Sequence, residues 1–100
     1  FMYSAAKAGV VSLTQNLARE WATLGVRVNA LRPGSFPTRW SMEHFIDADR
    51  QRRIFDHTPM RRFGEPEELV GGVVWLASDA ASFVTGSVLS VDGGFTAMTI

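Results

Sequence analysis

The segment YSAAKAGVVSLTQNLAREWATLGVRVNALRPG, residues 3–34, joins a helix pattern to a strand pattern. At about 100° per residue, one set of side chains in residues 3–24 lies within about 60° of a single line. That set comprises Tyr3, Lys7, Val10, Thr14, Leu17, Trp21 and Leu24. Gly25 follows and can adopt the positive φ of a helix end. We therefore expect a helix over residues 3–24, buried along this stripe.

Two shorter patterns follow this helix. Residues 26–34, VRVNALRPG, alternate at their start and break at Pro33-Gly34, which predicts a strand and a turn. Residues 36–63 scatter aromatic and aliphatic side chains among charges, which indicates one or two short helices in a long excursion. Loops of this length in compact domains are usually functional lids or disordered.

The remainder predicts a second helix and a second strand. In GEPEELVGGVVWLASD, residues 64–79, Pro66 suits a first helical turn and two glutamates complement the helix dipole. We expect its buried positions to be Leu69, Val73, Trp75 and Leu76. SVLSV, residues 87–91, reads as a strand, and Asp92-Gly93-Gly94 as a turn. Strands separated by helices are expected to run parallel within a larger α/β sheet, and the chain is expected to be truncated at its N-terminus.

Composition narrows the function classes. Ten basic and ten acidic residues cancel, so nothing favours nucleic acid or an anionic membrane as a partner. The absence of cysteine excludes disulfides and thiolate zinc sites and is compatible with a reducing cytoplasm. No apolar run reaches the roughly 20 residues of a membrane span. His44 and His57 are expected to be exposed and no metal site is expected.

Tyr3 and Lys7 are the candidate catalytic pair. Residues four apart on a helix have Cβ atoms about 5–6 Å apart on one face. An ammonium at about 5 Å, at an effective dielectric of ~20, attracts a phenolate by roughly 3 kcal/mol. Such an attraction lowers the pKa of a phenol toward neutrality, which suits acid–base chemistry. The alternative is a core tyrosine beside a surface lysine, against which stands the position of Lys7 on the apolar stripe.

Other polar and small residues have simpler readings. The small side chains on the opposite face of the first helix reflect helix propensity or a dimer interface; they are Ala5, Ala8, Gly9 and Ser12. The alternating charges over residues 47–56 predict a solvated helix face. Arg61 and Arg62 have two interpretations: contact with an anionic substrate, or structural capping near Gly64, which we favour.

Three motifs in order carry a family resemblance: YSAAKAGV at residues 3–10, VNALRPG at 28–34 and SFVTGSVLSVDGG at 82–94. Across essentially its whole length the chain resembles the C-terminal part of the classical short-chain dehydrogenases/reductases, with a lean toward gluconate 5-dehydrogenase-like sugar and polyol enzymes. The resemblance implies the C-terminal part of a Rossmann-like doubly wound parallel sheet, lacking the N-terminal half with its glycine-rich cofactor loop. It also implies NAD or NADP and interconversion of a small-molecule alcohol and ketone.

The resemblance assigns roles to matching residues. Tyr3 matches the catalytic acid/base, and Lys7 the residue that favours its phenolate and binds the nicotinamide ribose. The segment expected to hold the nicotinamide carboxamide comprises Pro33, Gly34, Phe36 and Thr38. Residues 36–63 match the substrate lid, in which Trp40 either lines a sugar-binding cleft or anchors the lid. The helix and strand of residues 65–94 complete the single domain, and Asp92-Gly93-Gly94 is more often structural.

Rival functions remain open at this point. An enoyl reductase is disfavoured because its relatives typically separate tyrosine and lysine by more residues. A non-catalytic homologue would keep the helix for dimerisation or interaction. We expect a cytoplasmic oxidoreductase, assembled as a dimer or tetramer, of which residues 1–100 alone are inactive.

Overall fold

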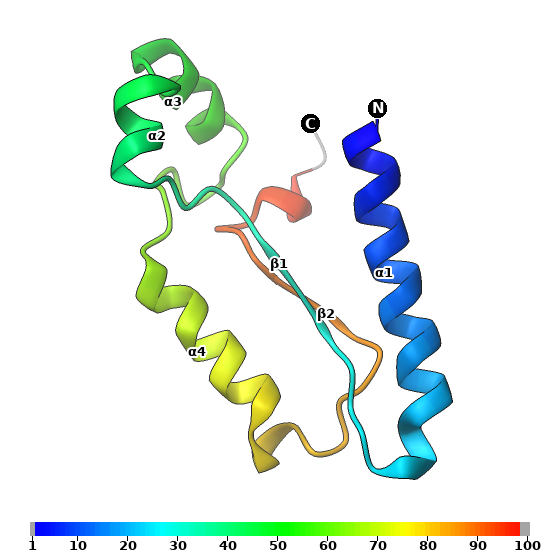
Figure 1. Ribbon diagram of the computed structural model, residues 1–100. Helices are drawn as coiled ribbons and strands as arrows, with labels where there is room; N and C mark the ends of the chain where they lie inside the picture. The colour runs from blue at the N-terminus through cyan, green and yellow to red at the C-terminus, as the bar shows by residue number, and fades with distance from the viewer. Residues whose placement is uncertain (1, 99–100) are drawn as a thin grey trace. The chain divides into compact units, whose positions relative to one another are not determined.

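The computed structural model describes residues 2–98, which form an α/β arrangement (Figure 1). In chain order its main elements are α1 (Met2–Trp21), β1 (Ala30–Pro33), α2 (Arg39–His44), α3 (Ala48–Asp56), α4 (Pro66–Ala77) and β2 (Val88–Val91). Short 3-10 turns lie at Ala22–Leu24, Asp79–Ala81 and Phe95–Ala97. The described residues divide into two compact units, one of residues 2–31 with 72–89 and one of residues 32–71 with 90–98.

Helix α1 in the first unit begins and ends close to its predicted bounds. Gly25 closes the 3-10 turn that follows it, with φ of 79°. The middle of the predicted stripe is packed, with Thr14 buried and Leu17 half-buried beside the buried Ala18, whereas its ends are open, with Tyr3 and Leu24 each 72% exposed. Ala18 is buried because Gly86 lies against it, where an added Cβ would stand 3.4 Å from the Ala18 Cβ.

The prediction that Lys7 lies on a buried stripe is wrong for the described structure. Lys7 is exposed, as is every residue of α1 from Met2 to Val10. Within residues 2–98, nothing covers this first half of the helix. Periodicity identifies which side chains share a face, and only a neighbouring segment makes that face buried.

The two strands form a parallel pair (Figure 1). The Ala30 N–H donates to the Ser87 carbonyl at 2.9 Å, and the Gly34 N–H donates to the Val91 carbonyl at 2.9 Å. This constant offset means that the strands run in the same direction, so the intervening chain is a crossover that contains helices. The expected α/β organisation is confirmed.

Strand β1 starts later than the sequence pattern suggests, because side chains replace the ladder before Ala30. The Asn29 amide donates to the Val84 carbonyl at 2.9 Å, and its Oδ1 accepts the Ser87 N–H at 3.0 Å. The Val28 N–H donates to the Thr85 hydroxyl at 3.1 Å. These bonds join the start of β1 to the connector that leads into β2.

Replacing Asn29 with Ala is expected to destabilise the protein by about 0.5–1.5 kcal/mol, because the hydrogen bonds of its side chain to the Val84 carbonyl and the Ser87 N–H are lost. Denaturant unfolding of the whole protein measures the change. Asn16→Ala is the matched control, since the Asn16 amide contacts only Ser12 and Arg19 on its own helix. Equal effects of the two substitutions would contradict a stabilising role for the Asn29 hydrogen bonds between β1 and the connector.

The long excursion of the second unit contains two short helices, as predicted. Thr38 caps α2 by accepting the Ser41 N–H at 3.1 Å. Asp47 caps α3 by accepting the Arg50 N–H at 2.8 Å. Both caps are local side-chain to backbone bonds of the kind that start helices.

Helix α4 begins at Pro66 as expected, but its packing differs from the prediction. Leu69, Gly72 and Leu76 are half-buried, whereas Val73 is 52% exposed and Trp75 is 41% exposed. The assignment of Trp75 to the core is therefore wrong within the described residues, because no segment of residues 2–98 covers that side of the helix. None of the described helices combines the length and apolarity needed to cross a membrane.

Candidate active site

Tyr3 and Lys7 project from the same face of α1, one turn apart. The Lys7 Nζ lies 5.2 Å from the centroid of the Tyr3 ring, which is within cation–π range. Both side chains are exposed in the first unit. Within residues 2–98, no carboxylate forms an ion pair with Lys7. The pair is therefore open to a ligand, with a phenol and an ammonium at adjacent positions.

The segment of residues 33–38, PGSFPT, belongs to the second unit. It follows the end of β1 and packs there against the residue that follows β2. A Cβ at Gly34 would stand 2.7 Å from the Asp92 Cα. This spacing is far below van der Waals contact, so only a glycine permits the two backbones to approach here. The physical requirement explains why Gly34 follows Pro33 at the strand end.

Phe36 packs its side chain inward and leaves its backbone unpaired. A Cβ at Gly64 would stand 2.2 Å from the Phe36 Cε2, so the ring lies on Gly64. The Gly64 N–H donates to the Ser35 carbonyl at 3.0 Å and holds the segment there. Among residues 2–98, neither the N–H nor the C=O of Phe36 has a hydrogen-bond partner. These two groups can pair with an amide of a bound molecule.

The Thr38 hydroxyl makes two hydrogen bonds within its own turn, both with Ser41. The hydroxyl accepts the Ser41 N–H at 3.1 Å and donates to the Ser41 Oγ at 3.0 Å. One lone pair remains, so toward a ligand Thr38 can act as an acceptor.

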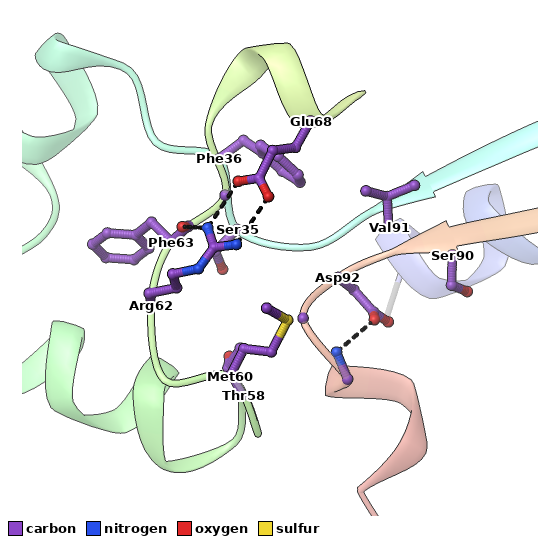
Figure 2. A pocket seen from close by; sticks show the side chains of 13 residues that line it. Ser35, Phe36, Thr58, Met60, Arg62, Phe63, Glu68, Ser90, Val91 and Asp92 are labelled. Carbon is purple, nitrogen blue, oxygen red and sulfur yellow. Dashed lines mark hydrogen bonds and ion pairs between the residues drawn. The ribbon is translucent and has the colours of Figure 1, made fainter. Parts of the chain in front are cut away.

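A cavity of about 300 Å³ lies within the second unit, near the end of β2 (Figure 2). Its charged side chains are Arg62, Glu68 and Asp92. The Asp92 carboxylate accepts hydrogen bonds from the Gly94 N–H at 3.0 Å and from the hydroxyl and N–H of Thr96 at 2.8 Å and 3.0 Å. Burial raises the pKa of Asp92, but these bonds outweigh it and hold the pKa below its ordinary value. Asp92 thus has a structural role in the turn.

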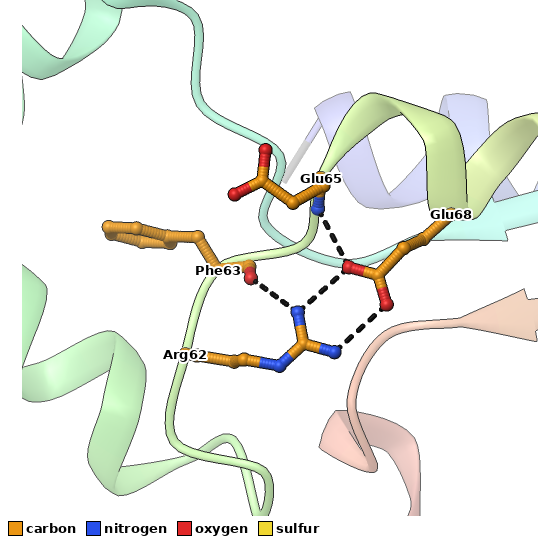
Figure 3. Close-up of polar contacts among 4 residues, drawn as sticks. All are labelled: Arg62, Phe63, Glu65 and Glu68. Carbon is orange, nitrogen blue, oxygen red and sulfur yellow. Dashed lines mark hydrogen bonds and ion pairs between the residues drawn. The ribbon is translucent and has the colours of Figure 1, made fainter.

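Arg62 and Glu68 form a bidentate ion pair across the start of α4 (Figure 3). The two N–O distances are 2.8 Å and 2.9 Å, and Arg62 also donates to the Phe63 carbonyl at 3.0 Å. Glu68 accepts the Glu65 N–H at 2.9 Å. The guanidinium is thereby occupied, which supports the structural reading of Arg62 over substrate contact. Arg61 pairs with Asp56 at 3.3 Å.

The ion pair predicts an acid-dependent stability difference. The hydrogen bond from Arg62, followed by that from the Glu65 backbone, lowers the pKa of Glu68 from 4.5 to about 2. A lowered carboxyl pKa contributes stability that is complete above pH 4.5 and is lost as the pH falls toward 2. We expect Glu68→Gln to lower the unfolding temperature at pH 7, with the difference from wild type shrinking below pH 4.5. Glu67→Gln, in the same helical turn, is the control and should show no such pH dependence.

Trp40 lies on α2 and is 56% exposed. Its ring stacks on His44 at 4.4 Å between centroids and meets Phe45 edge-on at 5.0 Å. His44 and His57 are both exposed, as predicted, and each ring nitrogen Nδ1 pairs with a carbonyl of its own helix. Within residues 2–98, no three potential metal-ligating side chains gather.

Sequence reasoning grouped Arg50 with Arg52 and Arg53 as a solvated face. Arg52 and Arg53 do pair with Asp49, at 2.7 Å and 2.9 Å. Arg50 forms no ion pair among the described residues and lines two cavities of the second unit, one of them together with Arg53. Spacing alone did not separate these arginines, because all three lie within one turn of α3.

A family model described as enoyl-(acyl carrier protein) reductase matches residues 1–96. A crystal structure of a short-chain dehydrogenase from Leptospira borgpetersenii, with bound NAD+, superposes with a TM-score of 0.84 at 39% identity, covering 94% of this chain and 35% of that one. This chain belongs to the short-chain dehydrogenase/reductase family. The family resemblance of the three sequence motifs is confirmed.

Two further members show the range of the match. Galactitol 2-dehydrogenase (L-tagatose-forming) from Cereibacter sphaeroides is 48% identical over 94 residues, which are 94% of this chain and 37% of that protein. A structure from Beutenbergia cavernae, provisionally named an NAD(P)-dependent gluconate 5-dehydrogenase and holding NADP at low occupancy, has a TM-score of 0.88 at 49% identity. The match covers 96% of this chain and 39% of that structure.

The short-chain dehydrogenase/reductase segment described here thus spans about 37% of the length of the curated relative. It corresponds to the C-terminal portion of the Rossmann-like fold, as predicted. The gluconate dehydrogenase-like neighbour fits the predicted lean within the family.

Proposed function

We propose that the whole protein is an NAD(P)-dependent oxidoreductase that interconverts a small alcohol and a ketone. The observation that carries the proposal is the Tyr3–Lys7 pair, with Nζ 5.2 Å from the ring centroid on one exposed helix face. Family membership and relatives with bound NADP or NAD+ support it. Residues 1–100 alone are proposed to be inactive.

In the reducing direction, the Tyr3 hydroxyl donates its proton to the carbonyl oxygen of the substrate. Lys7 favours the resulting phenolate by its positive charge and donates hydrogen bonds to ribose hydroxyls. A bound reduced nicotinamide supplies the hydride. In the oxidising direction, the Tyr3 phenolate takes the proton of the alcohol.

The chain contains groups that fit a nicotinamide cofactor. Phe36 offers an unpaired backbone N–H and C=O, which match the donor and acceptor of a carboxamide. Thr38 offers its remaining lone pair to the carboxamide N–H. Pro33 and Gly34 position this segment at the end of β1. Lys7 is free of competing carboxylates within the described residues.

We further propose that residues 36–63 form the substrate lid and that Trp40 lines the substrate cleft. Its exposed ring, backed by His44, suits the C–H face of a sugar or polyol. The relatives named for galactitol and gluconate support a polyol or sugar-derived substrate. A homo-oligomer and a cytoplasmic location complete the proposal, with the small-residue face of α1 as an oligomer contact.

The description of the matching family model makes enoyl reduction a second candidate. The spacing of four residues between Tyr3 and Lys7, and the dehydrogenase relatives, favour alcohol–ketone chemistry instead. The test is the absorbance of reduced nicotinamide when the whole protein is given polyols, sugar acids, secondary alcohols or an enoyl thioester. Turnover of an alcohol supports the proposal. Turnover of the enoyl thioester alone, or cofactor binding without turnover of any substrate, would contradict it.

A further inference from the structure

A second cavity of the second unit, of about 430 Å³, lies beside the segment proposed to meet the nicotinamide. Its walls are Ser35, Phe36, Pro37, Ser41, Phe45, Ile46, Arg50 and Ile54. Six of these residues belong to the proposed lid or the nicotinamide segment between residues 35 and 46. A molecule held here therefore lies next to Phe36.

Arg50 is the single charged residue among the described residues that line this cavity. Within residues 2–98 it forms no ion pair, because Asp49 binds Arg52 and Arg53 and Asp56 binds Arg61. Arg50 also lines a neighbouring cavity of the second unit together with Asp47 and Asp49, where Asp47 accepts the backbone N–H of Arg50 and Asp49 pairs with Arg52 and Arg53. The Arg50 side chain is exposed at this wall, and its guanidinium presents a planar fork of N–H donors that can pair bidentately with a carboxylate.

Ser41 adds a directed donor to the same cavity. Its Oγ accepts the proton of the Thr38 hydroxyl at 3.0 Å, which leaves its own proton free to donate. Such a relay polarises the donating hydroxyl. One arginine and one hydroxyl donor suit a single negative charge, whereas a phosphate dianion would call for more cations than this cavity holds.

We infer that the substrate is a hydroxy acid or keto acid whose carboxylate is bound by Arg50 and Ser41 on the lid. The inference rests on the proposed function and names its substrate class. Arg50 is a specificity residue that contacts the carboxylate of the substrate. The apolar walls from Phe36, Phe45 and Ile54 then contact the carbon chain.

The test uses the whole protein and three acids, each paired with the alcohol in which –CH2OH replaces the carboxylate. The pairs are gluconate with sorbitol, 3-hydroxybutyrate with butane-1,3-diol, and lactate with propane-1,2-diol. We expect kcat/KM for at least one acid to exceed that of its neutral partner. Arg50→Gln should lower kcat/KM for that acid about 10- to 100-fold, mainly through KM, and leave the neutral partner within about twofold.

Arg52→Gln is the matched control, because Arg52 pairs with Asp49 and lines neither this cavity nor the other two that the structure describes. It should keep the preference for the acid. Arg50→Lys should recover part of the affinity, since it keeps the charge but loses the bidentate geometry. Oxidation of neutral alcohols without preference for any acid, or equal losses in Arg50→Gln and Arg52→Gln, would overturn the inference and leave the proposed function intact.

A binding measurement distinguishes failure of the carboxylate-site inference from failure of the proposed oxidoreductase function. Saturation-transfer NMR of the same acids with the whole protein reports contact whether or not turnover occurs. Binding that is lost in Arg50→Gln and kept in Arg52→Gln supports the carboxylate site even if the redox proposal fails. Acids that do not bind the wild type, or that bind all three proteins equally, overturn it.

Discussion

Tyr3→Phe in the whole protein is expected to lower kcat by about 10²- to 10⁴-fold, the usual loss when a positioned acid/base is removed. The substitution keeps the ring and deletes the hydroxyl that, in the proposed mechanism, exchanges a proton with the substrate oxygen. The ring remains available to the Lys7 ammonium, 5.2 Å from its centroid. Cofactor affinity should therefore stay within about twofold of the wild type.

Steady-state kinetics and a cofactor titration separate these two effects. Lys7→Ala should lower both kcat and cofactor affinity, because the same ammonium favours the phenolate and binds the ribose in the proposed mechanism. Ser4→Ala is the matched control, since it removes a hydroxyl from the adjacent position on a different face of α1. Full activity in Tyr3→Phe would contradict the proposed acid/base role of Tyr3.

Gly34→Ala is expected to destabilise the protein by about 1–3 kcal/mol or more, as overpacking against a fixed neighbour does. The added Cβ would stand 2.7 Å from the Asp92 Cα and 3.2 Å from the Asp92 carbonyl oxygen. Backbone atoms cannot move aside as a side chain can, because the Gly34 N–H is bonded to the Val91 carbonyl at 2.9 Å. The strand end must shift, and the segment proposed to hold the nicotinamide shifts with it.

The expected result is a lower unfolding free energy together with weaker cofactor binding. Gly71→Ala is the matched control, because its Cβ would meet no atom within 4 Å and it lies inside α4. Alanine in a helix is favoured over glycine by about 0.5–1 kcal/mol, so this control should be neutral or stabilising. If Gly34→Ala behaved in the same way, the close approach to Asp92 would be refuted.

Local features of the chain were predictable because they depend on neighbours within one turn. The bounds of α1, its end at Gly25 and the Tyr3–Lys7 spacing all follow from residues close in sequence. The start of α4 at Pro66 was predicted for the same reason. The parallel pairing of β1 and β2 was predictable from the helices between them.

Burial was predicted less well. Trp75 shares its helix with an apolar stripe, yet it is 41% exposed. Tyr3 belongs to a periodic apolar set, yet it is 72% exposed. A helical wheel reports which side chains are aligned, whereas burial depends on which other segment lies against them.

The sequence by itself determined the helices, the parallel α/β organisation and the spacing of the candidate pair Tyr3 and Lys7, since each is encoded by spacing along the chain. Only the tertiary structure showed that Asn29 joins a connector 55 residues away and that Gly34 must admit the backbone of Asp92. Tertiary structure also distinguished Arg50, which lines two cavities and forms no ion pair among the described residues, from Arg52, which lines none of the described cavities and pairs with Asp49. Contacts between residues distant in sequence depend on how the backbone brings them together, and no local pattern records that.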